Sequence, residues 1–107
     1  MGEARFCVEV TELAADDLDG IDTYWSDRGE AWRGEKYYHD LRDFALRELA
    51  DTGTARRGRL LGDRRNPNAR SLLAFGVYRI IYEIDETAER VNIIRFWHSH
   101  RDTPPLE

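Results

Sequence analysis

The residues best suited to chemistry lie together near the end of the sequence, in RFWHSHRD at residues 95–102. Two histidines, His98 and His100, can exchange protons near neutral pH, and Arg95 and Arg101 supply positive charge beside them. This composition is compatible with an acid–base site, a metal site, or a polar strand end that serves in packing and binding. The segments that position these side chains decide among the three.

An acid–base site of this kind would act on RNA. Cleavage by the 2′-hydroxyl requires a base, an acid and cations that stabilise the phosphate as its charge grows. His98 or His100 could move the protons. Four arginines could hold the phosphate: Arg70, Arg79, Arg95 and Arg101. The competing structural interpretation places His98 on the core beside Tyr78 and pairs the arginines with Glu83 and Asp102.

A metal site would have to be built from few ligands. His98 and His100 could share an ion with Asp102, but the one further histidine is His39 and the one cysteine is Cys7. We therefore expect no metal site. The sequence also lacks a phosphate-binding glycine loop, a nucleotide-binding glycine fingerprint, a serine-nucleophile motif and a zinc knuckle, so we expect no cofactor.

A protein-binding surface is the third possibility. The chain holds three tryptophans and five tyrosines, which is more than one small core requires. Aromatic residues and arginine are the types that anchor protein interfaces. Core packing explains Trp25 and Tyr38 well, and it explains Trp32 and Trp97 least.

Length and charge define what these residues belong to. The 107 residues suffice for one hydrophobic core, so we expect a single domain over 1–107, with 103–107 as a flexible tail. The net charge of −5 divides unevenly, because 1–54 hold fourteen acids and six bases, whereas 55–107 hold seven acids and ten bases, all arginine. An anionic partner would therefore meet the second half.

The composition also indicates the compartment. No run approaches the ~20 apolar residues of a membrane helix. The start lacks the basic and apolar regions of a secretory signal. A single cysteine cannot form an internal disulfide, which fits a reducing environment. We expect a cytoplasmic protein that does not interact with membranes.

The first half predicts a strand and two helices. Residues 5–10 are short, apolar and β-branched, as in a strand. Thr11 is a suitable N-cap for a helix that ends near Gly29, and its apolar face consists of Ala14, Leu18, Ile21 and Trp25. A second amphipathic helix follows over about 30–49, so the two form an antiparallel hairpin. Residues 51–68 lack a pattern and contain five arginines, which predicts a long basic loop.

The last third predicts β-structure. Period-2 alternation indicates strands over 69–75, 77–84 and 91–98, the last two joined by the polar turn DETAER. Matching their apolar faces sets Ile80 beside Phe96, with Ile94 also facing the core. The opposite face then carries Arg79, Arg95 and Trp97.

Together these elements predict an α+β fold in the order β-α-α-β-β-β. The helix hairpin packs on one face of a three- to four-stranded antiparallel sheet, and the N-terminal strand pairs at one edge.

The arrangement resembles the RelE/ParE toxins of bacterial type II toxin–antitoxin systems. The resemblance rests on ELAADDLDGIDTYW, ARSLLAFGVYRIIYEID and VNIIRFWHSHRD, and covers nearly the whole chain. Its most specific parts are the YRIIY segment at 78–82 and the ending HSHRD at 98–102.

The resemblance is closer to ParE-like members than to RelE-like members. Arg79 matches the arginine of the family's YR pair, and Arg70 stands for one of the lysines that RelE-like nucleases carry. Leu72 and Ser99 replace the other lysine and an arginine, and no tyrosine follows Arg101. The acidic total charge also differs from that of the strongly basic nucleases.

The resemblance implies a toxin that inhibits growth by binding DNA gyrase and is neutralised by a cognate antitoxin, without direct DNA binding of its own. The surface implied for the target is Arg70, Arg79, Arg95, Trp97, His98 and Arg101; the surface implied for the antitoxin is Trp32, Arg79, Arg95 and Trp97. One alternative is a ribosome-dependent mRNA endonuclease, which would bind the ribosome and mRNA and use Arg79, His98 and Arg101 as catalytic residues. The other is an inactive toxin-like module that only binds an antitoxin.

Overall fold

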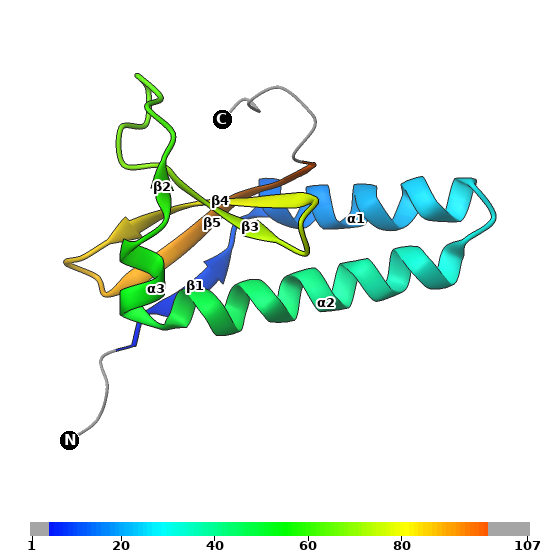
Figure 1. The fold of residues 1–107 in the computed structure, drawn as a ribbon, viewed down its shortest axis with the longest axis horizontal. Helices are drawn as coiled ribbons and strands as arrows, with labels where there is room; N and C mark the ends of the chain where they lie inside the picture. The colour runs from blue at the N-terminus through cyan, green and yellow to red at the C-terminus, as the bar shows by residue number, and fades with distance from the viewer. Residues whose placement is uncertain (1–4, 99–107) are drawn as a thin grey trace.

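The computed structural model describes residues 5–98. Its elements are β1 (Cys7–Val10), α1 (Glu12–Asp27), α2 (Ala31–Ala50), α3 (Thr52–Arg56), β2 (Arg59–Leu60), β3 (Arg70–Ala74), β4 (Tyr78–Asp85) and β5 (Arg90–His98). The two long helices form a hairpin that lies along one side of the sheet (Figure 1). No helix among the described residues is long and apolar enough to cross a membrane. The tail expected at 103–107 lies outside this range.

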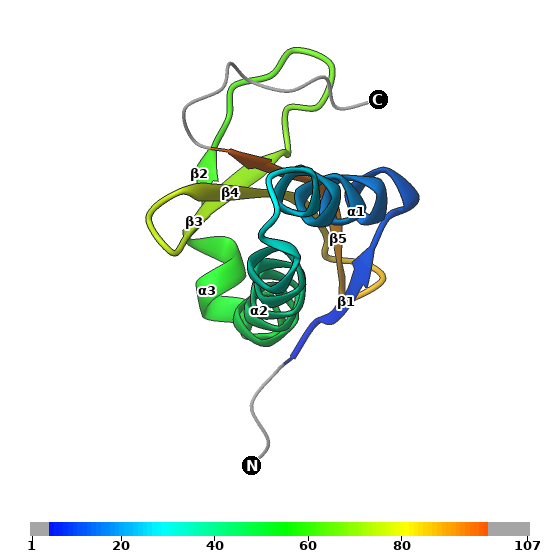
Figure 2. The same ribbon diagram turned by 90° about the vertical axis from the view of Figure 1, so that its right-hand side faces the viewer.

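The α+β fold predicted from the sequence is confirmed, with a larger sheet. The strands lie in the order β1-β5-β4-β3-β2, and α1 and α2 cover one face (Figure 2). β1 pairs at one edge, as expected, but it runs parallel to β5, so the five-stranded sheet is mixed. The additional strand is β2, which is only two residues long and therefore too short to show alternation in the sequence.

The prediction of a loop over 51–68 was wrong for its first part, which forms α3 and β2. Both elements are held by contacts from distant residues. The buried Tyr82 hydroxyl donates to the Ala55 carbonyl at 2.6 Å, and Arg70 Nη1 donates to the Gly58 carbonyl at 2.7 Å. Burial raises the pKa of the Tyr82 phenol, which keeps the hydroxyl protonated as a donor. A five-residue helix has little stability of its own, so its sequence carries no clear signal.

Helix α1 begins where the sequence predicts. The Thr11 hydroxyl oxygen accepts from the Ala14 backbone N–H at 3.3 Å, as an N-cap does. The same hydroxyl donates to the Ile93 carbonyl at 2.7 Å, which attaches the helix start to β5. Ala14 and Leu18 are fully or almost fully buried against the sheet.

A β-bulge shifts the faces of β5. Ile80 pairs with Phe96 and Arg79 with Trp97, as predicted. The register then passes from Arg95 opposite Ile81 to Ile93 opposite Tyr82, so Ile94 is the extra residue. Ile94 is buried, at 8% exposure, but the prediction that it shares the core face with Phe96 was wrong, because Ile93 joins the core cluster instead. Strict alternation cannot reveal such an insertion.

Asp17 holds α1 against β5 where β1 no longer does. β1 pairs with residues 90–93 only. Beyond that point the Asp17 carboxylate accepts a hydrogen bond from the Phe96 backbone N–H at 3.1 Å. It also accepts two from Arg95, at 2.7 Å from Nε and 2.8 Å from Nη2. The Asp17 side chain thus accepts from a backbone N–H that β1 does not reach, and it neutralises the nearly buried Arg95 cation.

The two long helices approach closely at Gly34. A Cβ built there would lie 2.8 Å from both the carbonyl oxygen and a carboxylate oxygen of Asp22 on α1. Gly20, within α1, has no neighbour within 4 Å of its own Cβ position. Alanine substitutions at Gly34 and Gly20 therefore provide a matched test and control for the close helix contact.

We expect Gly34→Ala to destabilise the fold by about 1–3 kcal/mol, because the added methyl group must push the helices apart. Gly20→Ala should instead stabilise it by about 0.5–1 kcal/mol through helix propensity. Urea unfolding followed by circular dichroism measures both. Equal effects of the two substitutions would contradict the close helix contact.

We also expect Asp17→Asn to destabilise the fold by about 2–4 kcal/mol, since it leaves the Arg95 cation without its counter-charge. Side-chain exposures of 14% for Asp17 and 10% for Arg95 place the pair largely out of water. Asp16→Asn, at an exposed neighbouring position on α1, should change stability by less than about 0.5 kcal/mol. Urea unfolding at neutral pH measures both variants. An Asp17→Asn variant with wild-type stability would disprove the stabilising role of this ion pair.

Candidate functional site

The sheet face opposite the helices carries a row of three side chains on three neighbouring strands. Leu73 of β3 pairs with Arg79 of β4, and Arg79 pairs with Trp97 of β5. We call these residues the open-face row. Arg79 and Trp97 were expected there, whereas Leu73 was missed. Alternation could have found it, because Leu72 packs against the core and its neighbour must point the other way.

The next row on the same face is much less exposed. It consists of Ser71, Ile81 and Arg95, of which Ile81 is fully buried and Arg95 is 8% exposed. The connection between β2 and β3 reaches this face, since Asn66 Nδ2 donates to the Glu83 carboxylate at 3.0 Å. The available surface is therefore narrower than the sequence suggests.

Arg95 is engaged on two sides. Its guanidinium binds Asp17 through two hydrogen bonds and lies 4.7 Å from the centre of the Trp97 ring. The hydrogen bond to Asp17 raises the pKa of Arg95, so the cation persists at any physiological pH. In this position Arg95 supports Trp97 from beneath, and little of the guanidinium remains accessible to another molecule.

His98 lies at the end of a series of aromatic contacts. It pairs with Tyr78 in the sheet, and the two rings meet edge to face at 5.6 Å. The series continues from Tyr78 to Tyr37 at 5.7 Å and from Tyr37 to Trp25 at 5.9 Å. The placement of His98 beside Tyr78 is the one that the structural interpretation of the sequence expected.

A groove of about 570 Å³ lies between α1 and the ends of β4 and β5. Trp25, Trp97 and His98 contribute rings to its lining, and Asp16 and Asp17 contribute carboxylates. The Trp25 indole nitrogen is buried and has no hydrogen-bond partner among the described residues. A buried donor of this kind favours a ligand that brings an acceptor. The groove adjoins the open-face row through Trp97.

Two further expected residues, Arg70 and Trp32, lie away from this surface. Arg70 pairs with Tyr82, so it belongs to the helix-covered face, where it binds the Gly58 carbonyl. Trp32 is 63% exposed in the first turn of α2. The start of α2 lies at the far tip of the hairpin (Figure 1). Arg101 lies outside the described residues.

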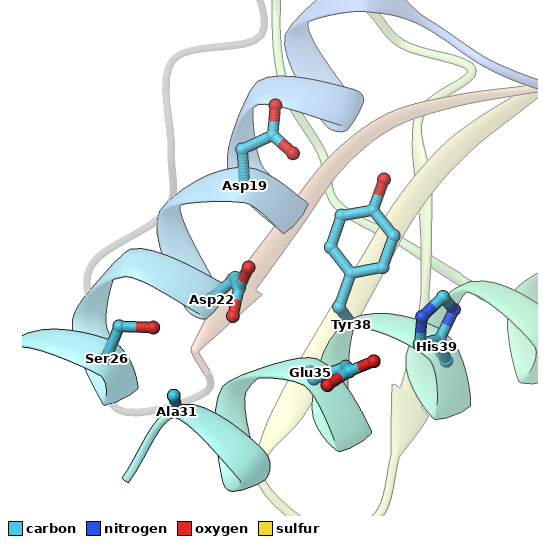
Figure 3. Close-up of a pocket in the computed structure, with 7 residues that line it drawn as sticks. All are labelled: Asp19, Asp22, Ser26, Ala31, Glu35, Tyr38 and His39. Carbon is cyan, nitrogen blue, oxygen red and sulfur yellow. The ribbon is translucent and has the colours of Figure 1, made fainter. Parts of the chain in front are cut away.

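A second hollow, of about 460 Å³, lies between the two long helices and contains acidic side chains (Figure 3). Asp19 and Asp22 of α1 face Glu35 and His39 of α2 across it. Within residues 5–98, no three His, Cys, Asp or Glu side chains are grouped so that they could hold a metal ion. The two other ligands considered from the sequence, His100 and Asp102, lie outside this range.

Comparison with known proteins gives the family. Residues 8–103 match the model of the ParE toxin of the type II toxin–antitoxin system parDE. A search of curated protein sequences found no significant match.

Two solved structures share the fold. A chain of the chromosomal ParDE toxin–antitoxin system from P. aeruginosa superposes with a TM-score of 0.70 at 19% identity, covering 87% of this chain and 95% of that one. A chain of the toxin–antitoxin complex RelBE2 from Mycobacterium tuberculosis superposes with a TM-score of 0.66 at 24% identity, covering 88% of this chain and 98% of that one. With the family match over nearly its whole length, this chain belongs to the ParE toxins of type II toxin–antitoxin systems.

Proposed function

We propose that this toxin inhibits growth in the bacterial cytoplasm by binding DNA gyrase, and that a cognate antitoxin neutralises it. The observation that carries the proposal is the state of Arg95 and its neighbours. Arg95, three residues before His98, is bound to Asp17 and lies under the Trp97 ring, with a side-chain exposure of 10%. Such a unit presents a rigid aromatic surface to a partner, which suits binding better than catalysis.

The endonuclease alternative requires a different use of the same residues. His98 would have to move protons while its ring packs on Tyr78 at the end of the aromatic series. The net charge of −5 also works against affinity for a phosphate backbone. A gyrase binder needs neither proton transfer nor a basic surface, so both features agree with the proposal.

The antitoxin is expected to cover the open-face row and the adjoining groove. Trp97 joins the two, and its ring is held in place by Arg95. Rigid aromatic residues flanked by a partly buried cation are typical of interface anchors. Trp32, at the far tip of the hairpin, supplies a second and separate contact.

We expect His98→Gln to remain as toxic as the wild type at equal protein levels. Glutamine keeps hydrogen-bonding capacity at the position but cannot transfer protons near neutral pH. Induced expression without antitoxin should change plasmid supercoiling and leave transcripts intact, and the purified variant should inhibit supercoiling by gyrase in vitro. A folded, antitoxin-binding His98→Gln variant without toxicity would instead favour RNA cleavage.

We expect Arg79→Ala to reduce toxicity without abolishing it. As one contact among many, its loss should weaken gyrase binding by about 1–2 kcal/mol, so higher expression partly restores growth inhibition. A transition-state contact would behave differently, since its loss lowers a rate by ~10²–10³. A titration of inducer against growth distinguishes the two, and complete loss of toxicity at every level would contradict gyrase binding.

A further inference from the structure

The turn between β3 and β4 contains an unexpected residue. Phe75 and Gly76 both have a left-handed backbone, with φ of 53° and 72°, and Val77 N–H donates to the Ala74 carbonyl at 3.2 Å. Hairpin turns with two left-handed residues favour Asn-Gly or Gly-Gly. Phenylalanine is a strained choice there because its Cβ crowds the following carbonyl oxygen. Backbone strain of this kind is found often at functional positions, which makes Phe75 a candidate for a role outside the fold itself.

Phe75 is also exposed together with a neighbouring apolar residue. The Phe75 side chain is 50% accessible, although its ring touches Phe44 of α2 at a centroid distance of 5.2 Å. Leu73, two residues earlier, is 55% accessible and begins the open-face row. Phe75 thus lies on the helix-covered side, against Phe44, whereas Leu73 lies on the opposite face, so the two apolar side chains flank the outer edge of β3.

The backbone of β3 is open at the same place. β2 pairs only with Arg70 and Ser71. The Ala69 carbonyl accepts from Leu61 N–H, so alternate residues from Ala69 onward direct their backbone groups toward the β2 side. Leu73 is in this set, and no described strand lies beside it on that side. An extended segment could continue the sheet from the end of β2.

Charge indicates what kind of segment fits. Residues 55–70, which precede and border this edge, contain six arginines and one acid, Asp63. Arg57, Arg59 and Arg64 are exposed. Two copies of this chain joined edge to edge would bring two such basic segments together, which is unfavourable. An acidic segment with apolar side chains complements both the charge and the exposed rings.

We infer that the outer edge of β3 and the Phe75 tip bind an extended acidic and apolar segment of the cognate antitoxin, added as a short strand beside Leu73. The inference rests on the proposed neutralisation by an antitoxin. Phe75 acts as the anchor of this contact, because a partner that covers its half-exposed ring removes apolar surface from water.

The substitution Phe75→Asn in the full chain tests the inference, because the thermal stability of the variant and its affinity for the antitoxin are measured separately. Asparagine accepts the left-handed backbone, so the variant should unfold at a temperature no lower than the wild type. It should bind the purified antitoxin at least about tenfold more weakly in calorimetry, as expected for an interface anchor. A variant that is less stable yet binds as the wild type does would show that Phe75 only packs, and would overturn the inference.

Glu89 provides the matched control. It is the other non-glycine residue with a left-handed backbone among residues 5–98, at φ 54°, and it is exposed at the opposite end of β4. Glu89→Asn should relieve the same strain, raise the unfolding temperature and leave antitoxin binding unchanged. Weaker binding in this variant would mean that turn relaxation, and not loss of the ring, causes the effect.

Hydrogen exchange tests the added strand directly. The Leu73 amide should exchange quickly in the isolated toxin and become protected in the complex. If the wild-type toxin does not bind the antitoxin, the proposed function fails and the inference fails with it. If the complex forms but Leu73 stays unprotected, the inference alone fails. Sedimentation tests for self-association. If the wild-type toxin is a dimer and Phe75→Asn dissociates it, the edge binds a second copy of this chain, and the inference is overturned.

Discussion

The Asp17 carboxylate, placed between the helical hairpin and the last strand, is the contact on which the position of Arg95 and Trp97 depends. It accepts hydrogen bonds from Arg95 and from the Phe96 backbone, 78 and 79 residues away in sequence. Burying two charges costs free energy, and here the cost is offset because both nitrogens and the strand N–H find acceptors on one group. Without it, the end of β5 would be an open edge next to an unpaired cation.

The bulge at Ile94 makes this arrangement possible. It returns Ile93 to the core face and leaves Arg95 at the strand edge, within reach of α1. Arg95 in turn lies under the ring of Trp97, which gives the tryptophan a fixed position between the groove and the open-face row. A side chain that is ordered before binding loses less conformational entropy in a complex, so this support favours recognition.

The molecule separates its acidic, aromatic and basic residues by location. The acidic first half forms the hairpin, and the arginine-rich connection borders the outer edge of the sheet. Aromatic residues from α1, α2, β4 and β5 meet in one series between these regions. A partner that wraps the toxin would therefore meet acidic, aromatic and basic surfaces in succession, which provides specificity through charge as well as through shape.

Local sequence determined the two long helices, the Thr11 cap, and the pairing of Ile80 with Phe96 and of Arg79 with Trp97. These features follow from side-chain spacing within single elements and from matching two apolar faces. The family resemblance likewise depended on short motifs in a fixed order. The ion pair between Asp17 and Arg95, the short elements α3 and β2, and the exposed tip at Phe75 were decided only by tertiary structure. The ion pair and the two short elements depend on partners elsewhere in the chain, which no local pattern encodes. The Phe75 tip depends on a left-handed backbone that phenylalanine does not predict.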